Sequence, residues 1–384
     1  MDLTINLHSM AGIYIHIPFC RKACHYCNFH FSTSKQRIPE MVEAIRKEAG
    51  IRRDYLAERI DTIYFGGGTP SLLLKDEVRN TIETVKGLFE VDEKAEITLE
   101  ANPDDITEES LQAWMEAGIN RLSIGIQSFF EADLQWMNRA HTAEQAGNCI
   151  ALAQKKGIHN ISIDLIYGTP SLTDESWKKN VQTALSLNIP HLSCYALTVE
   201  PKTALAKMIA THQLPDVDAD KQARHFALLT QWLAEAGFEH YEISNFALPG
   251  FRSRHNSSYW EGKPYLGLGP SAHSFNGSSR QWNVSNNSLY LKALETGTVP
   301  FEMEQLTGVQ QLNEFIMTRL RTMEGIPLAG VRENWGEEKM NALVLSAQKH
   351  IRQGQLILSN DFLQLTAGGK FLADGIAADL FTNE

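Results

Sequence analysis

The chain has 384 residues, of which 43% are hydrophobic and 21% are charged, with 35 Lys and Arg against 46 Asp and Glu. This length suits one large and one small domain, and the composition is that of a globular protein with a full core. The net charge of −11 and the lack of a long basic run argue against nucleic-acid binding. No apolar run is long enough to cross a bilayer and no secretory signal is recognisable, so we expect a cytoplasmic protein without a transmembrane segment.

Six strand-like segments alternate with six helix-like segments along residues 1–237. The predicted strands are rich in β-branched and aromatic residues and cover 12–18, 61–68, 96–103, 121–128, 161–168 and 191–198. The predicted helices cover 39–58, 75–89, 107–118, 142–157, 173–188 and 218–237. Such an alternation predicts an α/β fold with parallel strands joined by helical crossovers.

Glycine and polar residues cluster at the C-terminal ends of these strands. They are residues 66–69, Glu100 with Asn102, Gln127, and Asp164. A doubly wound sheet concentrates its site at one crevice, whereas a barrel builds its site from the ends of several strands. Four contributing strands therefore favour a partial (βα)6 barrel.

The strand–helix rhythm stops after residue 237. Residues 238–288 are rich in Gly, Ser, Asn and aromatic residues and are predicted to be an extended connecting segment of strands and loops. In residues 289–384 we expect helices near 310–322, 337–353 and 370–380, and a hairpin over 356–365. This order is winged-helix-like. The usual role of such a module is DNA binding, but residues 301–384 hold 7 basic and 11 acidic residues, which favours a structural lid or docking domain.

Three of the five cysteines lie within eight residues, just after the first predicted strand. In Cys20-x3-Cys24-x2-Cys27, three thiolates can converge on one centre. A structural zinc site needs four ligands, and His25 or His30 could supply the fourth. A [4Fe–4S] cluster held by three cysteines would leave one iron open to a non-protein ligand. The spacing favours the cluster over zinc.

The cysteine motif, the predicted barrel and Gly66-Gly67-Gly68-Thr69-Pro70 together resemble the radical S-adenosylmethionine enzymes. Glycines at a strand end let a backbone approach a ligand closely, although a tight turn needs them too. The resemblance implies that the open iron binds S-adenosylmethionine, which is cleaved to a 5′-deoxyadenosyl radical. It also implies that Gly67, Gly68 and Thr69 contact the methionyl group of this cofactor.

Five further residues match cofactor-binding positions of the same family. They are Tyr14, Glu100, Gln127, Arg139 and Asp164. Ribose hydroxyls and an ammonium group need acceptors, which the acidic and amide side chains supply. A carboxylate needs a donor, and arginine offers a rigid fork for it.

Segments 241–247, 254–260 and 267–274 resemble the oxygen-independent coproporphyrinogen oxidases and their relatives. Those oxidases carry a fourth cysteine where this chain has Phe29, and a longer segment before the position of Tyr14. Both differences favour the sister group of heme chaperones. In that group His255-Asn-x2-Tyr259-Trp260 is the segment linked to heme, so His255 is the predicted iron ligand, with His273 as a second candidate.

The expected function is therefore noncovalent binding of heme and its delivery to acceptor hemoproteins, such as those of the respiratory chain. A flavodoxin- or ferredoxin-like protein is the expected electron donor. Two alternatives stay open: oxidative decarboxylation of coproporphyrinogen III, and radical chemistry on another substrate.

Overall fold

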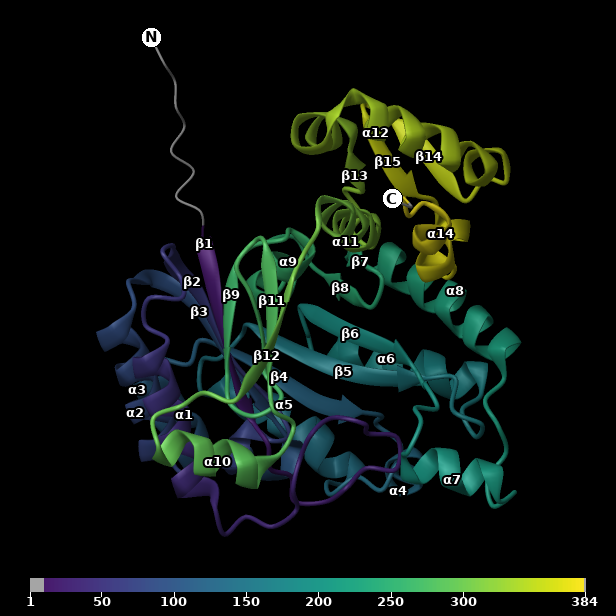
Figure 1. Cartoon of the computed structure of the whole chain (residues 1–384). Helices are drawn as coiled ribbons and strands as arrows, with labels where there is room; N and C mark the ends of the chain where they lie inside the picture. The colour runs from purple at the N-terminus through teal and green to yellow at the C-terminus, as the bar shows by residue number, and fades with distance from the viewer. Residues whose placement is uncertain (1–9, 383–384) are drawn as a thin grey trace.

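The computed structural model describes residues 10–382 and is built around one mixed sheet of twelve strands (Figure 1). Six of these strands are parallel and neighbour one another in sequence order: β1 (Met10–Ile17), β2 (Arg59–Gly67), β3 (Val91–Ala101), β4 (Arg121–Gln127), β5 (Ile161–Tyr167) and β6 (His191–Ala196). A doubly wound sheet would reverse this order at a switch point. The consecutive order confirms the predicted partial (βα)6 barrel.

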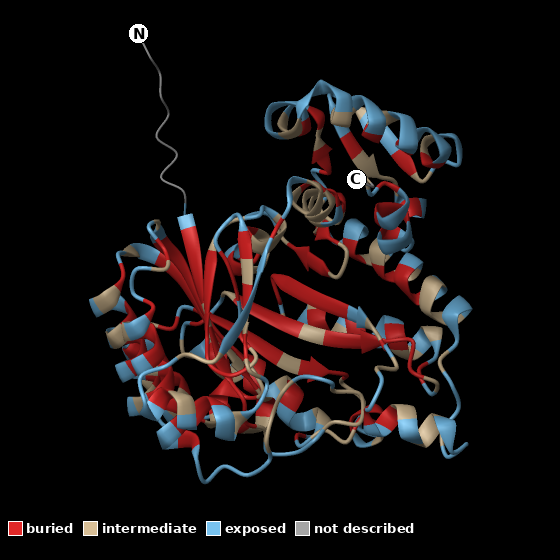
Figure 2. Ribbon diagram, in the orientation of Figure 1, coloured by how far each residue is buried: buried red, intermediate tan, exposed pale blue. Residues whose placement is uncertain are grey.

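Helices cover the outer face of the barrel, and the strands between them are almost entirely buried (Figure 2). The crossover helices are α1 (Ile38–Ile51), α2 (Lys75–Leu88), α3 (Glu108–Ala117), α5 (Ala143–Lys155) and α6 (Asp174–Ser186), and α8 (Ala219–Glu235) follows β6. Thr107, Thr142 and Thr173 cap α3, α5 and α6 by accepting a backbone N–H three residues on. The short helices α4 (Glu131–Trp136) and α7 (Ala204–Ala210) were not predicted, because one or two turns give no clear periodicity.

Residues beyond α8 extend the sheet at both edges. β7 (Glu239–Glu242) and β8 (Asn245–Ala247) add to β6, and β9 (Tyr265–Leu268) pairs in parallel with β1. β10 (His273–Phe275), β11 (Ser279–Asn283) and β12 (Phe301–Gln305) continue that second edge, and α10 (Asn287–Glu295) packs against α1. One expectation was wrong here: residues 254–260 form a helix, α9 (Arg254–Trp260), rather than extended chain.

The C-terminal residues have a hydrophobic core of their own, which begins at Leu312. Its elements are α11 (Gly308–Leu320), β13 (Ile326–Pro327), α12 (Leu328–Arg352), β14 (Leu356–Ser359), β15 (Phe362–Leu365), α13 (Ala367–Lys370) and α14 (Ala373–Asp379). The hairpin turns at Asn360 and Asp361, which both have positive φ, as a two-residue turn requires. This helix–helix–hairpin order confirms the winged-helix-like prediction, although the last predicted helix is divided in two.

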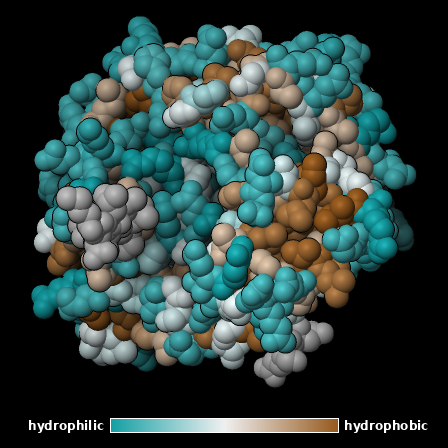
Figure 3. Space-filling view, turned by 90° about the horizontal axis from the view of Figure 1, so that it is seen from above, coloured by the Kyte–Doolittle hydropathy of each residue, from teal (hydrophilic) through white to brown (hydrophobic). Residues whose placement is uncertain are grey.

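The surface seen from above is mostly hydrophilic, with one gathered apolar patch on the side where Figure 1 places the C-terminal domain (Figure 3). In the part of the chain that the structure describes, no helix has both the length and the apolar character to span a bilayer. The domain boundaries predicted at residues 237 and 288 stay predictions. The helix α10 lies just after the second boundary, and its buried residues pack with the barrel core rather than with the C-terminal core.

Candidate cofactor cavity

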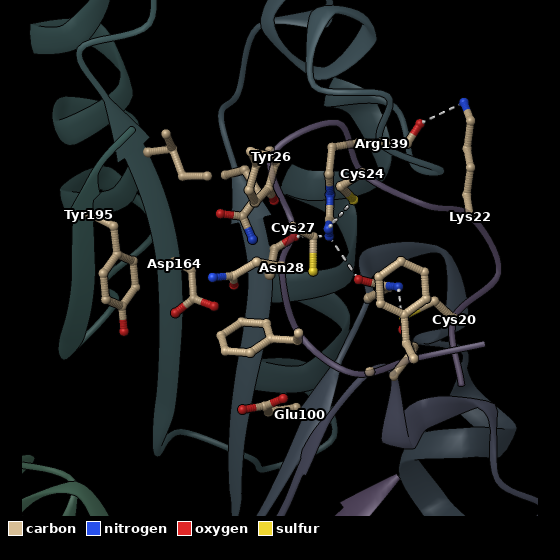
Figure 4. Close-up of a pocket in the computed structure, with 18 of the residues that line it drawn as sticks. Cys20, Lys22, Cys24, Tyr26, Cys27, Asn28, Glu100, Arg139, Asp164 and Tyr195 are labelled. Atoms are coloured by element: carbon tan, nitrogen blue, oxygen red, sulfur yellow. Dashed lines mark hydrogen bonds between the residues drawn. The ribbon is translucent and has the colours of Figure 1, made fainter. Parts of the chain in front are cut away.

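A cavity of about 420 Å³ opens at the C-terminal ends of the barrel strands (Figure 4). Ten of the twelve site residues predicted from the sequence line it: Cys20, Cys24, Cys27, Gly67, Gly68, Thr69, Glu100, Gln127, Arg139 and Asp164. Nine of them come from the loop after β1 and from the ends of β2 to β5, and Arg139 lies between α4 and α5. Parallel strands bring these distant sequence positions together because their C-terminal ends share one edge.

The three thiols share one wall of the cavity. Burial raises the pKa of Cys20 to about 11, although a hydrogen bond with Thr69 lowers it. Burial also raises the pKa of Cys27. Within residues 10–382, no three His, Cys, Asp or Glu side chains are close enough together to hold a metal ion. Three thiols on one loop nevertheless form a donor set that suits an iron–sulfur cluster.

The two histidines that could complete a zinc site do not line this cavity. The Nδ1 of His25 is hydrogen-bonded to the Trp136 carbonyl oxygen at 2.9 Å, and the Nε2 of His30 to Asn287 Oδ1 at 2.7 Å. Neither histidine is therefore placed to complete a zinc site with the thiols.

Arg139 spans the space between the thiols and the strand ends. Its Nη1 donates to Cys24 Sγ at 3.3 Å, and its Nη2 donates to Asn102 Oδ1 and to the Gly125 carbonyl oxygen, both at 2.7 Å. Gly125 permits this approach, since a Cβ there would lie 3.1 Å from Arg139 Nη2. A guanidinium held in this way is ready to receive a carboxylate.

The glycine run at the end of β2 has a structural reason that the sequence did not reveal. A Cβ on Gly68 would lie 2.6 Å from the carbonyl oxygen of Phe19, and one on Gly67, which has a φ of 108°, would meet the ring of His16 at 2.7 Å. These glycines let β2 pass close to the end of β1 and the start of the cysteine loop. Substituting Gly68 should therefore disturb the cysteine loop as well as any ligand in the cavity.

Two half-buried carboxyl groups, those of Glu100 and Asp164, also line the cavity. Burial raises the pKa of Glu100 to about 8, while a hydrogen bond from Tyr64 lowers it. Burial also raises the pKa of Asp164 to about 6, opposed by a hydrogen bond from Ser193 and by nearby arginines. Gln127 lies beside them with a φ of 66°, an uncommon backbone conformation for a residue with a side chain. Cavity-lining acids with raised pKa values and local backbone strain are typical of a ligand site.

Two predicted site residues, Tyr14 and His255, do not line the cavity. They lie further toward the N-terminal ends of the strands, with their rings stacked at a centroid distance of 6.4 Å. His255 is 1% exposed, and both ring nitrogens are hydrogen-bonded, to Thr62 Oγ1 at 2.8 Å and to the Tyr259 hydroxyl at 2.9 Å.

The cavity also contains aromatic residues that were not predicted to line it. Tyr195, at the end of β6, is 43% exposed, and Phe29, at the position of the fourth oxidase cysteine, is 68% exposed. Strand alternation could have indicated Tyr195, because Ser193 and Tyr195 fall on the same face as the hydrogen-bonded Ser162 of β5.

Comparisons with known proteins agree with this geometry. A family model described as the radical SAM superfamily matches residues 14–184, and one described as the HemN C-terminal domain matches residues 306–372. A protein of Mycobacterium tuberculosis strain H37Rv named heme chaperone HemW is 34% identical over 375 residues, covering 96% of this chain and 94% of that protein. The chain belongs to the HemW family of radical SAM proteins.

Other similarities support the same family and fold. Heme chaperone HemW of Bacillus subtilis strain 168 is 31% identical, covering 96% of this chain and 98% of that protein. The structure of coproporphyrinogen III oxidase (HemN) from Escherichia coli superimposes with a TM-score of 0.84 at 22% identity, covering 98% of this chain and 91% of the oxidase. At that identity the similarity establishes the fold of the HemW-family chain, while its function needs separate argument.

Proposed function

We propose that this protein is a heme chaperone of the cytoplasm, which binds heme noncovalently and hands it to an acceptor hemoprotein. The observation that carries the proposal is the similarity of nearly the whole chain to proteins named heme chaperone HemW. The acidic C-terminal domain supports a role in docking to proteins rather than to nucleic acid. Acceptors of the respiratory chain, and an electron donor of flavodoxin or ferredoxin type, belong to the same proposal.

The cavity residues fit a cluster and S-adenosylmethionine. Cys20, Cys24 and Cys27 would hold the cluster, and Arg139 would receive the carboxylate of the cofactor. Glu100 and Asp164 would accept hydrogen bonds from its ammonium and ribose hydroxyl groups. When bound, the two groups would supply one-electron chemistry. The protein's own contribution is to orient the cofactor and to limit the access of water.

We place the heme iron ligand at His273 rather than at His255. His273 is exposed, its ring makes no hydrogen bond to any of the described residues, and it lies 6.3 Å from the ring of Trp282 on β11. An open imidazole beside a large flat side chain is what a noncovalent heme site needs. Ligation by His255 would require one of its two hydrogen bonds to break and its ring, which is 1% exposed, to become accessible.

The second candidate is the oxidative decarboxylation of coproporphyrinogen III, which the oxidase fold favours. Phe29 argues against it, because an exposed phenyl ring lines the cavity at the position of the fourth oxidase cysteine. An anaerobic assay of the cluster-loaded protein with coproporphyrinogen III separates the two functions. We expect no protoporphyrinogen, and heme transfer to an apo-hemoprotein. Turnover without any heme transfer would rule out the chaperone.

A further inference from the structure

Two side chains connect α9 to the cofactor cavity through the barrel interior. The hydroxyl of Tyr64, on β2, donates a hydrogen bond to Glu100 Oε1 at 2.8 Å. The Tyr64 ring is stacked on the His255 ring at a centroid distance of 4.9 Å and an interplanar angle of 20°. Since Glu100 lines the cavity, two direct contacts join α9 to the cavity wall.

His255, Tyr64 and Glu100 form a column of contacting side chains, and nearby glycines keep this column closely packed. A Cβ on Gly66 would lie 2.9 Å from Tyr64 Cε1 and 3.1 Å from Glu100 Oε1, and a Cβ on Gly12 would lie 3.2 Å from the His255 ring. Any side chain at either position would push against the column, because Cβ contacts this short are strained. The two positions therefore leave Tyr64 and His255 little freedom to move.

The start of α9 is fixed as firmly as the column. The buried carboxylate of Glu96, on β3, accepts the backbone N–H groups of Arg254 and His255, both at 3.2 Å. Ser253 caps the helix by accepting the N–H of Asn256. At the other end of α9, the guanidinium of Arg321 from the C-terminal domain lies 5.2 Å above the Trp260 ring. The residues of the heme-linked motif thus make internal contacts that hold α9 between the barrel and the C-terminal domain.

We propose that Tyr64 is a positioning residue for S-adenosylmethionine, and that His255 holds Tyr64 against Glu100. This inference rests on the cofactor site of the proposed function. A hydroxyl that donates to a carboxylate stabilises its charged form, so Tyr64 keeps Glu100 available as an acceptor. His255 acts through Tyr64, since the structure does not place it on the cavity wall.

The proposal predicts a particular pH dependence of cofactor binding. Burial raises the pKa of Glu100 to about 8, so affinity should rise with pH as Glu100 loses its proton. Without the Tyr64 hydroxyl the charged form loses a donor, and the midpoint of this rise should move to higher pH. The titratable and charged groups facing Glu100 are Tyr14 on β1, Tyr64 on β2, Arg121 on β4, Asp164 on β5, Tyr195 on β6 and Tyr259 on α9.

The test is calorimetry of S-adenosylmethionine binding to the full-length, cluster-loaded protein between pH 6 and 9. Y64F should bind about tenfold more weakly at pH 7.5, as expected for a lost bond to a charged group, and its midpoint should lie higher. Y290F is the matched control, because Tyr290 is also buried and its hydroxyl also donates to a buried carboxylate, that of Glu48, away from the cavity. H255F keeps a flat ring against Tyr64 and should lose less affinity than H255A.

The outcomes separate this inference from the proposed function. If wild type binds the cofactor and Y64F shows the same affinity and pH midpoint, the inference is overturned. If wild type does not bind the cofactor at all, the proposed site itself is wrong and the inference fails with it. If circular dichroism shows that Y64F does not fold, G66A is the second variant, because it crowds the same column and should raise the midpoint. An unchanged midpoint in G66A would overturn the inference.

Discussion

Arg139 Nη1 lies 3.3 Å from the sulfur of Cys24, although 115 residues separate the two in the chain. The same guanidinium is also bonded to the side chain of Asn102 and to the backbone of Gly125. One side chain therefore connects the cysteine loop with β3 and β4 (Figure 4). A fork that reaches three partners cannot be replaced by a single ammonium group.

Replacing Arg139 with lysine should weaken S-adenosylmethionine binding by about 10- to 100-fold, because charge is kept and the fork is lost. The measurement is calorimetry on cluster-loaded protein, with iron content determined alongside it. R224K is the control, since Arg224 makes a forked pair with Asp174 at the exposed surface. Wild-type affinity in R139K would remove Arg139 from the cofactor site.

Each of C20A, C24A and C27A should lose most bound iron and the broad visible absorption of the cluster. The two remaining cysteines, Cys149 and Cys194, are buried and do not line the cavity, so neither can replace a lost thiolate. C149A and F29A should keep both properties. A full complement of four irons per chain in C24A would contradict the cluster assignment.

Much of this site could be predicted because parallel strands follow one simple rule. Strand-end residues such as Glu100 and Asp164 must meet at one edge, whatever their separation in the chain. The cysteine spacing is likewise a local property. The cavity wall and the order of its residues along the chain could therefore be predicted before any contact was known.

The part that could not be predicted depends on long-range packing. His255 looks like an open ligand when read beside Tyr259 and Trp260, yet the helix turns its ring into the barrel, where Thr62 and Tyr64 meet it. The reason for Gly68 was hidden in the same way, because the atoms it accommodates belong to Ile17 at the end of β1 and to Phe19 just beyond it. Neither contact leaves a pattern in the local sequence.

Replacing Asp164 with asparagine should stabilise the cofactor-free protein while weakening cofactor binding. The pKa of Asp164 is raised to about 6 in the folded state, so between about pH 4 and 6 the folded chain holds more protons than the unfolded chain. Stability therefore falls as pH rises through this window and stays reduced above it. D164N removes this loss of stability. Its free energy of unfolding should exceed that of wild type by roughly 1–3 kcal/mol at pH 7.5, and by less at pH 4.5.

The measurement for Asp164 is urea unfolding at the two pH values, together with calorimetry of S-adenosylmethionine binding at pH 7.5. The cofactor should bind more weakly to D164N by about 1–3 kcal/mol, as for an unpaired partner in a buried site. D133N is a suitable control for the cofactor-binding measurement, because Asp133 is a buried acid bonded to Ser128 and does not line the cavity. Equal gains at both pH values would show that the Asp164 charge is not the cause.

Heme titration distinguishes His273 from His255 as the iron ligand. We expect about one heme per chain, and H273A should shift the Soret band and speed heme release, because an axial imidazole is lost. W282A should weaken binding without changing the ligand-field spectrum, since it removes only a packing face. H255F should leave the heme spectrum as in wild type while altering cofactor affinity, in keeping with its internal contacts. If instead H273A and wild type give superimposable spectra and release rates while H255F changes both, heme binding must open α9, and His255 is the ligand.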